Sequence, residues 1–183
     1  MKRITFLFLF VIGSNLGAQE FSFESIFVTG ADGYIQKFGA FPLGYGVQLS
    51  TDAIIGINTP WYFGLFLHLG SGISSQSITG TSLIYRSSIY FSGTPMGAVN
   101  LPLDSNTLFT VMGGPEVGSI LYYTEKTLTY AYGGRLEVML KKSNIFPDKD
   151  LIISFPLHYL SRADGSWSGG LGMRIGFAWE NFN

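Results

Sequence analysis

The sequence contains no cysteine and unusually little charge. The absence of cysteine among 183 residues excludes a disulfide framework and a thiolate metal site. Charged residues make up 13 % of the chain, about half of what is usual in soluble domains. The formal net charge is -1, so the chain lacks the basic excess that is typical of nucleic-acid-binding proteins. With 46 % hydrophobic and 16 % aromatic residues, the chain is poorly suited to a surface that faces water.

Long apolar runs are absent beyond the first residues, which excludes transmembrane helices in the rest of the chain. Two basic residues, the apolar stretch 4–12 and the small residue Ala18 predict a secretory signal peptide that is cleaved after Ala18. An N-terminal membrane anchor is the alternative, but the apolar run is about half the length that a bilayer-spanning helix needs. We therefore expect a signal peptide at 1–18 and one domain at 19–183.

What repeats along the chain is an alternation of large apolar residues with small or polar ones, which predicts β-strands. In Gly169–Trp179 every second residue is large and apolar, and the residues between them are glycine or alanine apart from Arg174. Eight segments are expected to be strands: 21–29, 39–50, 61–73, 83–93, 107–121, 128–140, 150–160 and 169–179. The stretches 51–57 and 96–103 also look extended. They either lengthen the second and fourth strands or add a pair, so ten strands remain possible.

Turn-forming residues separate these segments. The connections are expected in two alternating sets, which are 30–33, 74–82, 123–127 and 161–166 in one and 58–60, 104–106 and 141–149 in the other. No connection is long and no linker is visible, so the sequence predicts strands that are joined by hairpins within a single domain.

The composition of the two strand faces indicates which one points outward. In a soluble barrel the polar face meets water and carries many charges, whereas here it consists of Gly, Ser, Ala, Thr and a few isolated charges. Small residues fit a narrow interior, and large apolar residues tolerate lipid. A closed barrel is also the only sheet that pairs every backbone polar group in lipid. The sequence therefore predicts an all-β fold, a closed antiparallel up-and-down transmembrane β-barrel.

The tryptophans provide a check on strand length. Trp167 and Trp179 share one face of the last strand, and at ~3.3 Å per residue they lie roughly 40 Å apart along it. A tilt of about 40° reduces this distance to ~30 Å across the bilayer, close to the separation of two aromatic girdles. Trp61, at the start of its strand, is expected in the same girdle as Trp179. The alternative is that these are core tryptophans of a soluble sandwich.

The last strand resembles the C-terminal β-signal of bacterial outer-membrane proteins. Gly172, Ile175, Phe177 and Trp179 match its glycine, alternating apolar positions and near-terminal aromatic residue, although the chain continues to residue 183. As a whole, the chain after residue 18 resembles the small eight-stranded barrels of the OmpX, OmpA-transmembrane and OmpW kind. This resemblance implies localisation in the outer membrane, lipid as a partner, and recognition of the last strand by the barrel-assembly machinery.

Six charged residues are expected to point into the barrel: Glu24, Arg86, Glu116, Arg135, Glu137 and Arg174. Since isolated buried charges are costly and paired ones much less so, three acids and three arginines predict an internal network that fills the lumen. A polar track for ions or small solutes is the alternative. The bulky residues Tyr62, Phe66, Tyr90 and Met112 are also expected inside, and they favour a closed lumen.

Catalytic and metal-binding signals are weak. His68 and His158 fall on the inner face without the partners of a metal site, so neither a metal nor a cofactor is expected. The stretch 157–165 faintly resembles the His-x-Ser motif of the outer-membrane lipid A deacylases, which would make His158 a base and Ser161 a nucleophile. The spacing here is His-x-x-Ser, which places the two side chains on opposite faces of a strand.

Three function classes therefore remain open. The first is a non-enzymatic barrel with a plugged polar lumen, which stabilises the envelope or offers surface contacts. The second is an OmpW-like channel for small or apolar molecules, and the third is a lipid-processing enzyme.

Overall fold

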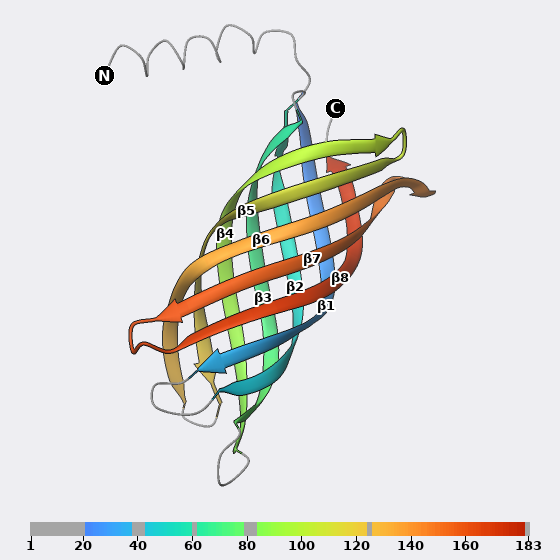
Figure 1. Cartoon of the computed structure of the whole chain (residues 1–183). Coiled ribbons are helices and arrows are strands. Elements are labelled where there is room, and N and C mark those ends of the chain that lie inside the picture. The colour runs from blue at the N-terminus through green and yellow to red at the C-terminus, as the bar shows by residue number, and fades with distance from the viewer. Residues whose placement is uncertain (1–20, 38–42, 60–61, 79–83, 124–125, 182–183) are drawn as a thin grey trace, which may run out of the picture.

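The computed structural model describes residues 21–37, 43–59, 62–78, 84–123 and 126–181, which form a closed antiparallel β-barrel (Figure 1). Its strands are β1 (Ser22–Lys37), β2 (Gly44–Asn58), β3 (Phe63–Ile78), β4 (Ile84–Asp104), β5 (Thr107–Tyr122), β6 (Thr127–Phe146), β7 (Lys149–Arg162) and β8 (Trp167–Asn181). Each strand pairs with the next, and β8 pairs with β1 to close the ring. No helix in these ranges is long and apolar enough to cross a membrane. The predicted eight-stranded antiparallel barrel is confirmed.

The two ends of the barrel differ in what they contain. We call the end where β1 begins and β8 finishes the terminal end, which lies uppermost in Figure 1 and also carries the β2–β3, β4–β5 and β6–β7 turns. The opposite end, called the loop end, carries the other four connections. This arrangement follows from an even number of hairpin-connected strands, because the chain then returns to the end where it entered.

Several strands are longer than the sequence pattern predicted. Residues 51–57 extend β2 and residues 96–103 extend β4, which is why the ring closes with eight strands and not ten. The turn expected at 30–33 is wrong, since these residues lie within β1. The turn expected over 141–149 is much shorter, because β6 continues to Phe146 and β7 begins at Lys149. Gly30 and Asp32 are small residues of the inner wall and do not mark a turn, whereas Asp148 lies in the short β6–β7 turn with a φ of 61°.

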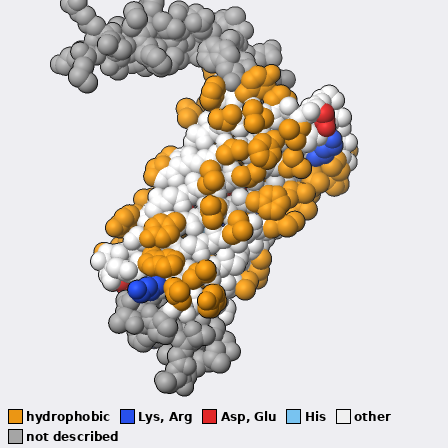
Figure 2. Space-filling model, viewed as in Figure 1, with side chains coloured by type: hydrophobic (Ala, Val, Ile, Leu, Met, Phe, Trp, Pro, Cys, Tyr) orange, Lys and Arg blue, Asp and Glu red, His pale blue; other side chains and the backbone are white. Residues whose placement is uncertain are grey.

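Side chains alternate between the inside and the outside of the wall along the strands. Leu65 and Tyr130 expose 74 % and 73 % of their surface, whereas Val28 and Arg174 expose 0 % and 1 %. Hydrophobic side chains cover the length of the visible wall, and the charged side chains in view lie at its two ends (Figure 2). The large apolar face therefore points outward and the face of small and polar residues encloses the lumen.

The small residues of the inner face make room for the few large polar ones. Gly30 on β1 lies opposite Arg174 on β8. A Cβ atom at position 30 would overlap the Met173 carbonyl and lie 2.8 Å from Arg174 Cγ. The small residues on the inner faces of β1 and β8 therefore leave the space that the buried Arg174 side chain occupies.

Candidate functional site

The lumen is filled by side chains that form successive layers along the barrel axis. The inward residues of β1 show the order, starting from the terminal end: Glu24 is polar, Ile26 and Val28 are apolar, Asp32 is charged, and Tyr34 borders a cavity. All of them are buried. We call these the terminal polar layer, the apolar layer, the charged layer and the loop-side cavity.

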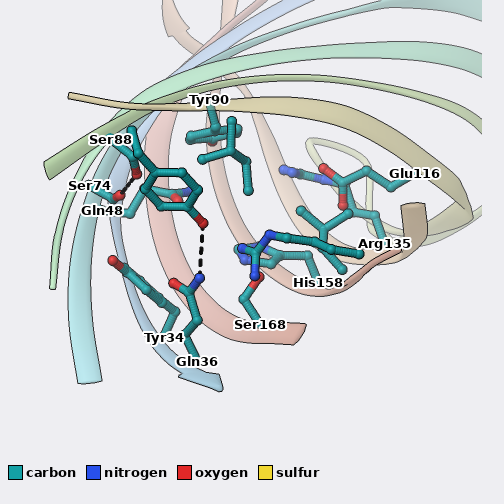
Figure 3. A pocket seen from close by; sticks show the side chains of 14 residues that line it. Tyr34, Gln36, Gln48, Ser74, Ser88, Tyr90, Glu116, Arg135, His158 and Ser168 are labelled. Carbon is teal, nitrogen blue, oxygen red and sulfur yellow. Dashed lines mark hydrogen bonds between the residues drawn. The ribbon is translucent and has the colours of Figure 1, made fainter. Parts of the chain in front are cut away.

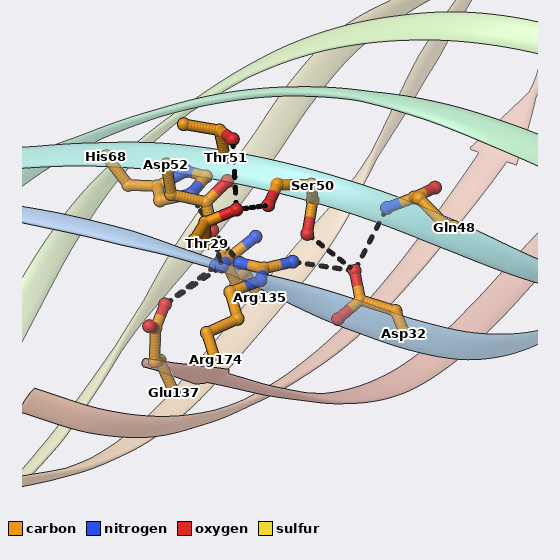
Figure 4. A network of polar contacts seen from close by, with 10 residues as sticks. All are labelled: Thr29, Asp32, Gln48, Ser50, Thr51, Asp52, His68, Arg135, Glu137 and Arg174. Atoms are coloured by element: carbon orange, nitrogen blue, oxygen red, sulfur yellow. Dashed lines mark hydrogen bonds and ion pairs between the residues drawn. The ribbon is translucent and has the colours of Figure 1, made fainter. Parts of the chain in front are cut away.

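The charged layer consists of Asp32, Asp52, His68, Glu116, Arg135, Glu137 and Arg174, all of them buried. Asp52 Oδ2 is its centre (Figure 4). This oxygen accepts a hydrogen bond from Arg135 Nη2 at 2.9 Å and forms a close ion pair with Arg174 Nη1. His68 Nε2 lies 3.2 Å from the same oxygen. Side chains from three strands, β3, β6 and β8, therefore converge on one carboxylate of β2.

Further contacts extend this network across the lumen. Arg135 donates to Glu137 Oε2 through both Nε and Nη2, at 3.0 and 2.9 Å. Arg174 Nη2 donates to Asp32 Oδ2 at 2.7 Å. Asp32 also accepts hydrogen bonds from Gln48 at 3.1 Å and from Ser50 at 3.2 Å. The network thus ties β1 to β2, β6 and β8 through charge-assisted hydrogen bonds, which are about twice as strong as neutral ones.

The charged layer contains more acids than arginines. Four carboxylates face two guanidinium groups, and Glu116 Oε2 and Glu137 Oε1 have no hydrogen-bond partner among the described residues. No group of three or more His, Asp or Glu side chains suited to a metal ion occurs in the part of the chain that the structure describes. The layer is therefore an arginine–carboxylate network that is only partly satisfied.

The apolar layer separates the charged layer from the terminal end. It comprises Ile26, Val28, Ile54, Phe66, Met96, Ala98, Met112, Met139, Ile152 and Ala178, which are in mutual contact. None of these side chains is more than 5 % exposed. Because the layer offers no polar group and contains three methionines that adapt to irregular spaces, it forms a hydrophobic barrier to water and ions.

The terminal polar layer closes the barrel beyond the apolar layer. Lys141 Nζ lies 2.8 Å from Glu24 Oε1, and Asn58 Nδ2 donates to Glu24 Oε2 at 2.7 Å. The chain of hydrogen bonds continues from Asn100 to Asn58 at 2.8 Å and from Thr110 to Asn100 at 2.7 Å. Glu24 thus has partners on both carboxylate oxygens, unlike the carboxylates of the charged layer.

The loop-side cavity lies on the other side of the charged layer (Figure 3). It has a volume of about 30 Å³ and is lined by polar residues that include Tyr34, Gln48, Tyr90, Glu116 and His158. Within the described ranges, the buried Tyr90 hydroxyl and Glu116 Oε2 have no hydrogen-bond partner. A polar cavity of this size has room for water.

The turn between β7 and β8 is held by polar contacts at the loop end. The Ser166 backbone N–H donates to Asp164 Oδ1 at 2.9 Å, and the Ser166 hydroxyl donates to the same oxygen. Arg162 Nη1 in turn donates to the Ser166 hydroxyl at 3.3 Å. The two Ser166 hydrogen bonds, that of the hydroxyl first, lower the pKa of Asp164 below its ordinary value of 3.8.

The structure places five of the six charges expected inside the barrel in its lumen. Glu24, Glu116, Arg135, Glu137 and Arg174 are all buried, whereas the side chain of Arg86 lies outside the described part. Arg135 and Glu137 contact each other directly, but Glu24 pairs with Lys141 in a separate layer. Of the bulky residues expected inside, Phe66, Tyr90 and Met112 are buried. Tyr62 is an exception, since it lies 55 % exposed at the β2–β3 turn with a φ of 66°.

Sequence reasoning missed four buried charged residues: Asp32, Asp52, Lys141 and Arg162. Asp32, Lys141 and Arg162 lie in stretches that were expected to be turns. Asp52 lies in 51–57, which was expected either to lengthen the second strand or to add a further one. Continuing the period-2 pattern of each strand through its glycines would have placed all four on the inner face.

The candidate catalytic pair is not brought together. His158 is buried and lines the loop-side cavity. Ser161 lies on the outer face of β7, where it pairs with the outward residues Tyr132 and Trp167. The barrel wall therefore separates the imidazole from the hydroxyl, as the His-x-x-Ser spacing implies.

The two described tryptophans lie at opposite ends of β8. Trp167 stacks on Tyr159 at the loop end, with ring centroids 6.1 Å apart. Trp179 is 37 % exposed and lies 6.3 Å from the Phe177 ring at the terminal end. Trp61 lies outside the described residues. The outer wall thus carries aromatic side chains at both ends.

Comparisons with known proteins give a likeness of fold. No family model matches the sequence, and no curated protein matches it. Among solved structures, the chain is similar to Neisserial surface protein A (NspA), with 10 % identity and a TM-score of 0.55 over 90 % of this chain and 99 % of that one. It is also similar to Ail, the attachment invasion locus protein of Yersinia pestis, with 14 % identity and a TM-score of 0.45 over 85 % of this chain and 98 % of that one. The chain therefore has the same fold as NspA, a small closed antiparallel β-barrel.

Proposed function

We propose that this chain is an integral β-barrel of the bacterial outer membrane, with a plugged lumen and a non-enzymatic role in the envelope. The observation that carries this proposal is the distribution of apolar surface. Large hydrophobic side chains such as Leu65, Val117 and Leu171 are each at least 60 % exposed on the outer wall. In water this band would be an extended aggregation surface, whereas in a bilayer it meets hydrocarbon.

The contents of the lumen support a closed barrel. An eight-stranded barrel is just wide enough for its side chains to fill it. Here the apolar layer and the terminal polar layer lie in series across the lumen. An ion that entered from the loop end would have to leave the polar cavity and cross packed aliphatic side chains, which is costly.

The proposal assigns roles to the remaining sequence signals. Residues 1–18 act as the signal peptide that directs export, and the barrel-assembly machinery recognises β8. Trp167 and Trp179 anchor the two membrane interfaces, together with Trp61. Stabilisation of the envelope is the role that we favour, because few residues separate consecutive strands at the loop end, which leaves little surface for a large partner.

Two measurements on the mature chain test this function. Folded barrels resist dodecyl sulfate without heating, so we expect the unboiled and boiled proteins to migrate differently on a gel. We also expect no stable single-channel steps in a planar lipid bilayer. Identical migration, or a compact monomer in plain buffer without detergent, would show that the outer wall does not face lipid. Stable conductance steps would favour the channel and reject the plugged lumen.

A further inference from the structure

The pairing between β4 and β5 is interrupted in the middle of the two strands, around Pro95 and Pro115. Pairing runs as far as Gly93 opposite Val117 and resumes in the same register at Gly97 opposite Gly113. The three pairs between them are absent, and the middle one would place Pro95 opposite Pro115. Proline has no N–H, so Pro95 and Pro115 cannot exchange the two backbone hydrogen bonds that would join them. The pairs on either side would share these two bonds and are therefore lost as well.

The same place lacks large side chains on its outer surface. The outward residues on the two strands are Pro95, Gly97, Gly113 and Pro115, whereas the outward residues elsewhere in the wall are mostly large and apolar. The result is an open, shallow groove of about 710 Å³ over β1 to β5, bordered by residues such as Ile55, Leu65, Leu67, Pro95, Gly97 and Pro115. This groove lies over the part of the wall that encloses the apolar layer, since Phe66 and Met96 belong to both.

The chemistry of the groove is that of hydrocarbon. Its lining contains no charged or polar side chain. The two prolines remove hydrogen-bond donors along with the ladder bonds, so the interruption leaves no orphan N–H at the opposed positions. A methionine behind the groove can adjust its shape to an occupant. An occupant therefore gains from filling the groove with apolar atoms and gains little from polar ones.

We propose that this groove is a binding site for one hydrocarbon chain of a membrane lipid. The inference rests on the proposed membrane location, because the groove is continuous with the outward apolar band that would face lipid. Around most of the barrel a lipid chain would contact protruding side chains only. Where the pairing of β4 and β5 is interrupted, the lipid chain can lie between Leu65 and Leu67 on one side and Pro115 on the other. It then contacts more protein surface than it would elsewhere on the wall.

Two outward glycines of β4 provide a matched pair of variants. Gly97 lines the groove, and a Cβ atom built there meets nothing within 4 Å. Gly93, four residues earlier on the same face, is not part of the groove, and its Cβ atom would meet only ordinary contacts at 3.7 and 3.9 Å. Gly97→Leu is therefore expected to fill the groove without strain, and Gly93→Leu to leave it open.

Native mass spectrometry of the full mature barrel, titrated with a diacyl phosphatidylethanolamine, tests the proposal. We expect wild type and Gly93→Leu to retain one lipid, and Gly97→Leu to bind it about tenfold more weakly, a difference of about 1.4 kcal/mol. Equal retention by all three proteins would overturn the inference. A dimer that is lost only in Gly97→Leu would also overturn it, because the occupant would then be a second copy.

A measurement on the wild type alone removes any dependence on variant folding. A phospholipid with a photoreactive group on its acyl chain should label residues 55–57, 65–67 and 95–97 more than the outward residues of β7 in vesicles. Uniform labelling around the barrel would overturn the groove site while leaving the membrane location intact. Absence of labelling altogether would show that the barrel does not sit in lipid, which is failure of the proposed function.

Discussion

The two halves of the lumen differ in how completely their polar groups are satisfied. In the terminal half, Glu24 has a partner on each carboxylate oxygen, and the neighbouring layer is wholly apolar. In the loop half, the four carboxylates of the charged layer share its two arginines, and the Tyr90 hydroxyl and Glu116 Oε2 have no partner among the described residues. Buried polar groups that lack partners lower stability, so the terminal half closes the barrel and the loop half retains polar space.

This difference indicates where the barrel can change without unfolding. A tightly packed apolar layer does not tolerate loss of volume, whereas a polar cavity tolerates substitutions that remove an unpaired charge. The charged layer lies between the apolar layer and the polar cavity, and its Asp52 joins four strands.

The largest effect is expected from breaking the charged layer itself. Arg174→Leu removes the arginine partner of Asp32 and one partner of Asp52, and leaves two carboxylates short of positive charge in the interior. Loss of one partner of a buried ion pair costs about 3–5 kcal/mol. Urea unfolding of the barrel in lipid vesicles should show this loss. Lys142→Leu is the control, because its pair with Asp104 lies at the surface, where ion pairs contribute little to stability. An unchanged midpoint for Arg174→Leu would contradict a paired role.

The next effect concerns the apolar layer. Ile54 is 1 % exposed, and Ile54→Ala should lower the free energy of unfolding by about 2–5 kcal/mol because it leaves a cavity among packed side chains. The same unfolding assay measures it, with Ile35→Ala on the outer wall, outside the groove, as the control. If both variants unfolded alike, the layer would not be tightly packed.

A smaller effect of opposite sign is expected in the loop half. Glu116→Gln removes a negative charge from a layer with excess carboxylates and keeps nearly the same shape. We expect the free energy of unfolding to rise by about 1 kcal/mol, because a buried charge without a partner costs more than a buried neutral amide of the same shape. Glu24→Gln in the terminal half should instead destabilise the barrel, because it weakens the pair with Lys141. Equal signs for the two variants would remove the distinction between the halves.

The smallest effect lies in the β7–β8 turn. The hydrogen bonds of Ser166 depress the pKa of Asp164 in the folded protein. They therefore stabilise the turn above the ordinary pKa of the carboxyl, and this contribution disappears as pH falls through the folded value. Ser166→Ala should raise the pKa of Asp164 toward 3.8, as followed by NMR titration of its carboxyl carbon. A pKa that does not move would show that the serine hydroxyl is not its main cause.

The sequence predicted the number of strands and the orientation of the wall better than it predicted strand ends. The stretch 30–33 contains two glycines and an aspartate, which signal a turn in a soluble protein. In this narrow barrel Gly30 and Asp32 face the lumen while Gly33 faces outward, and Asp32 becomes a partner of Arg174. Because local turn signals and the inner wall use the same small residues, three of the four missed charges lay in stretches expected to be turns.

The partners within the lumen could not be read from the sequence for a different reason. Arg135 and Asp52 are 83 residues apart, and Arg174 and Asp32 are 142 residues apart. Period 2 shows that a residue faces inward, but the stagger between strands decides which inward residues share a level. Glu24 and Glu137 both point inside and still belong to different layers.

The sequence by itself determined that the strands have one apolar and one small or polar face, and that the apolar face points outward, because period 2 and side-chain size act along each strand independently. Only the tertiary structure decided the layers, the pairing of Arg174 and Arg135 with Asp52, and the groove where Pro95 meets Pro115. These features depend on the register of strands that are distant in sequence, and register is fixed only when the whole ring closes.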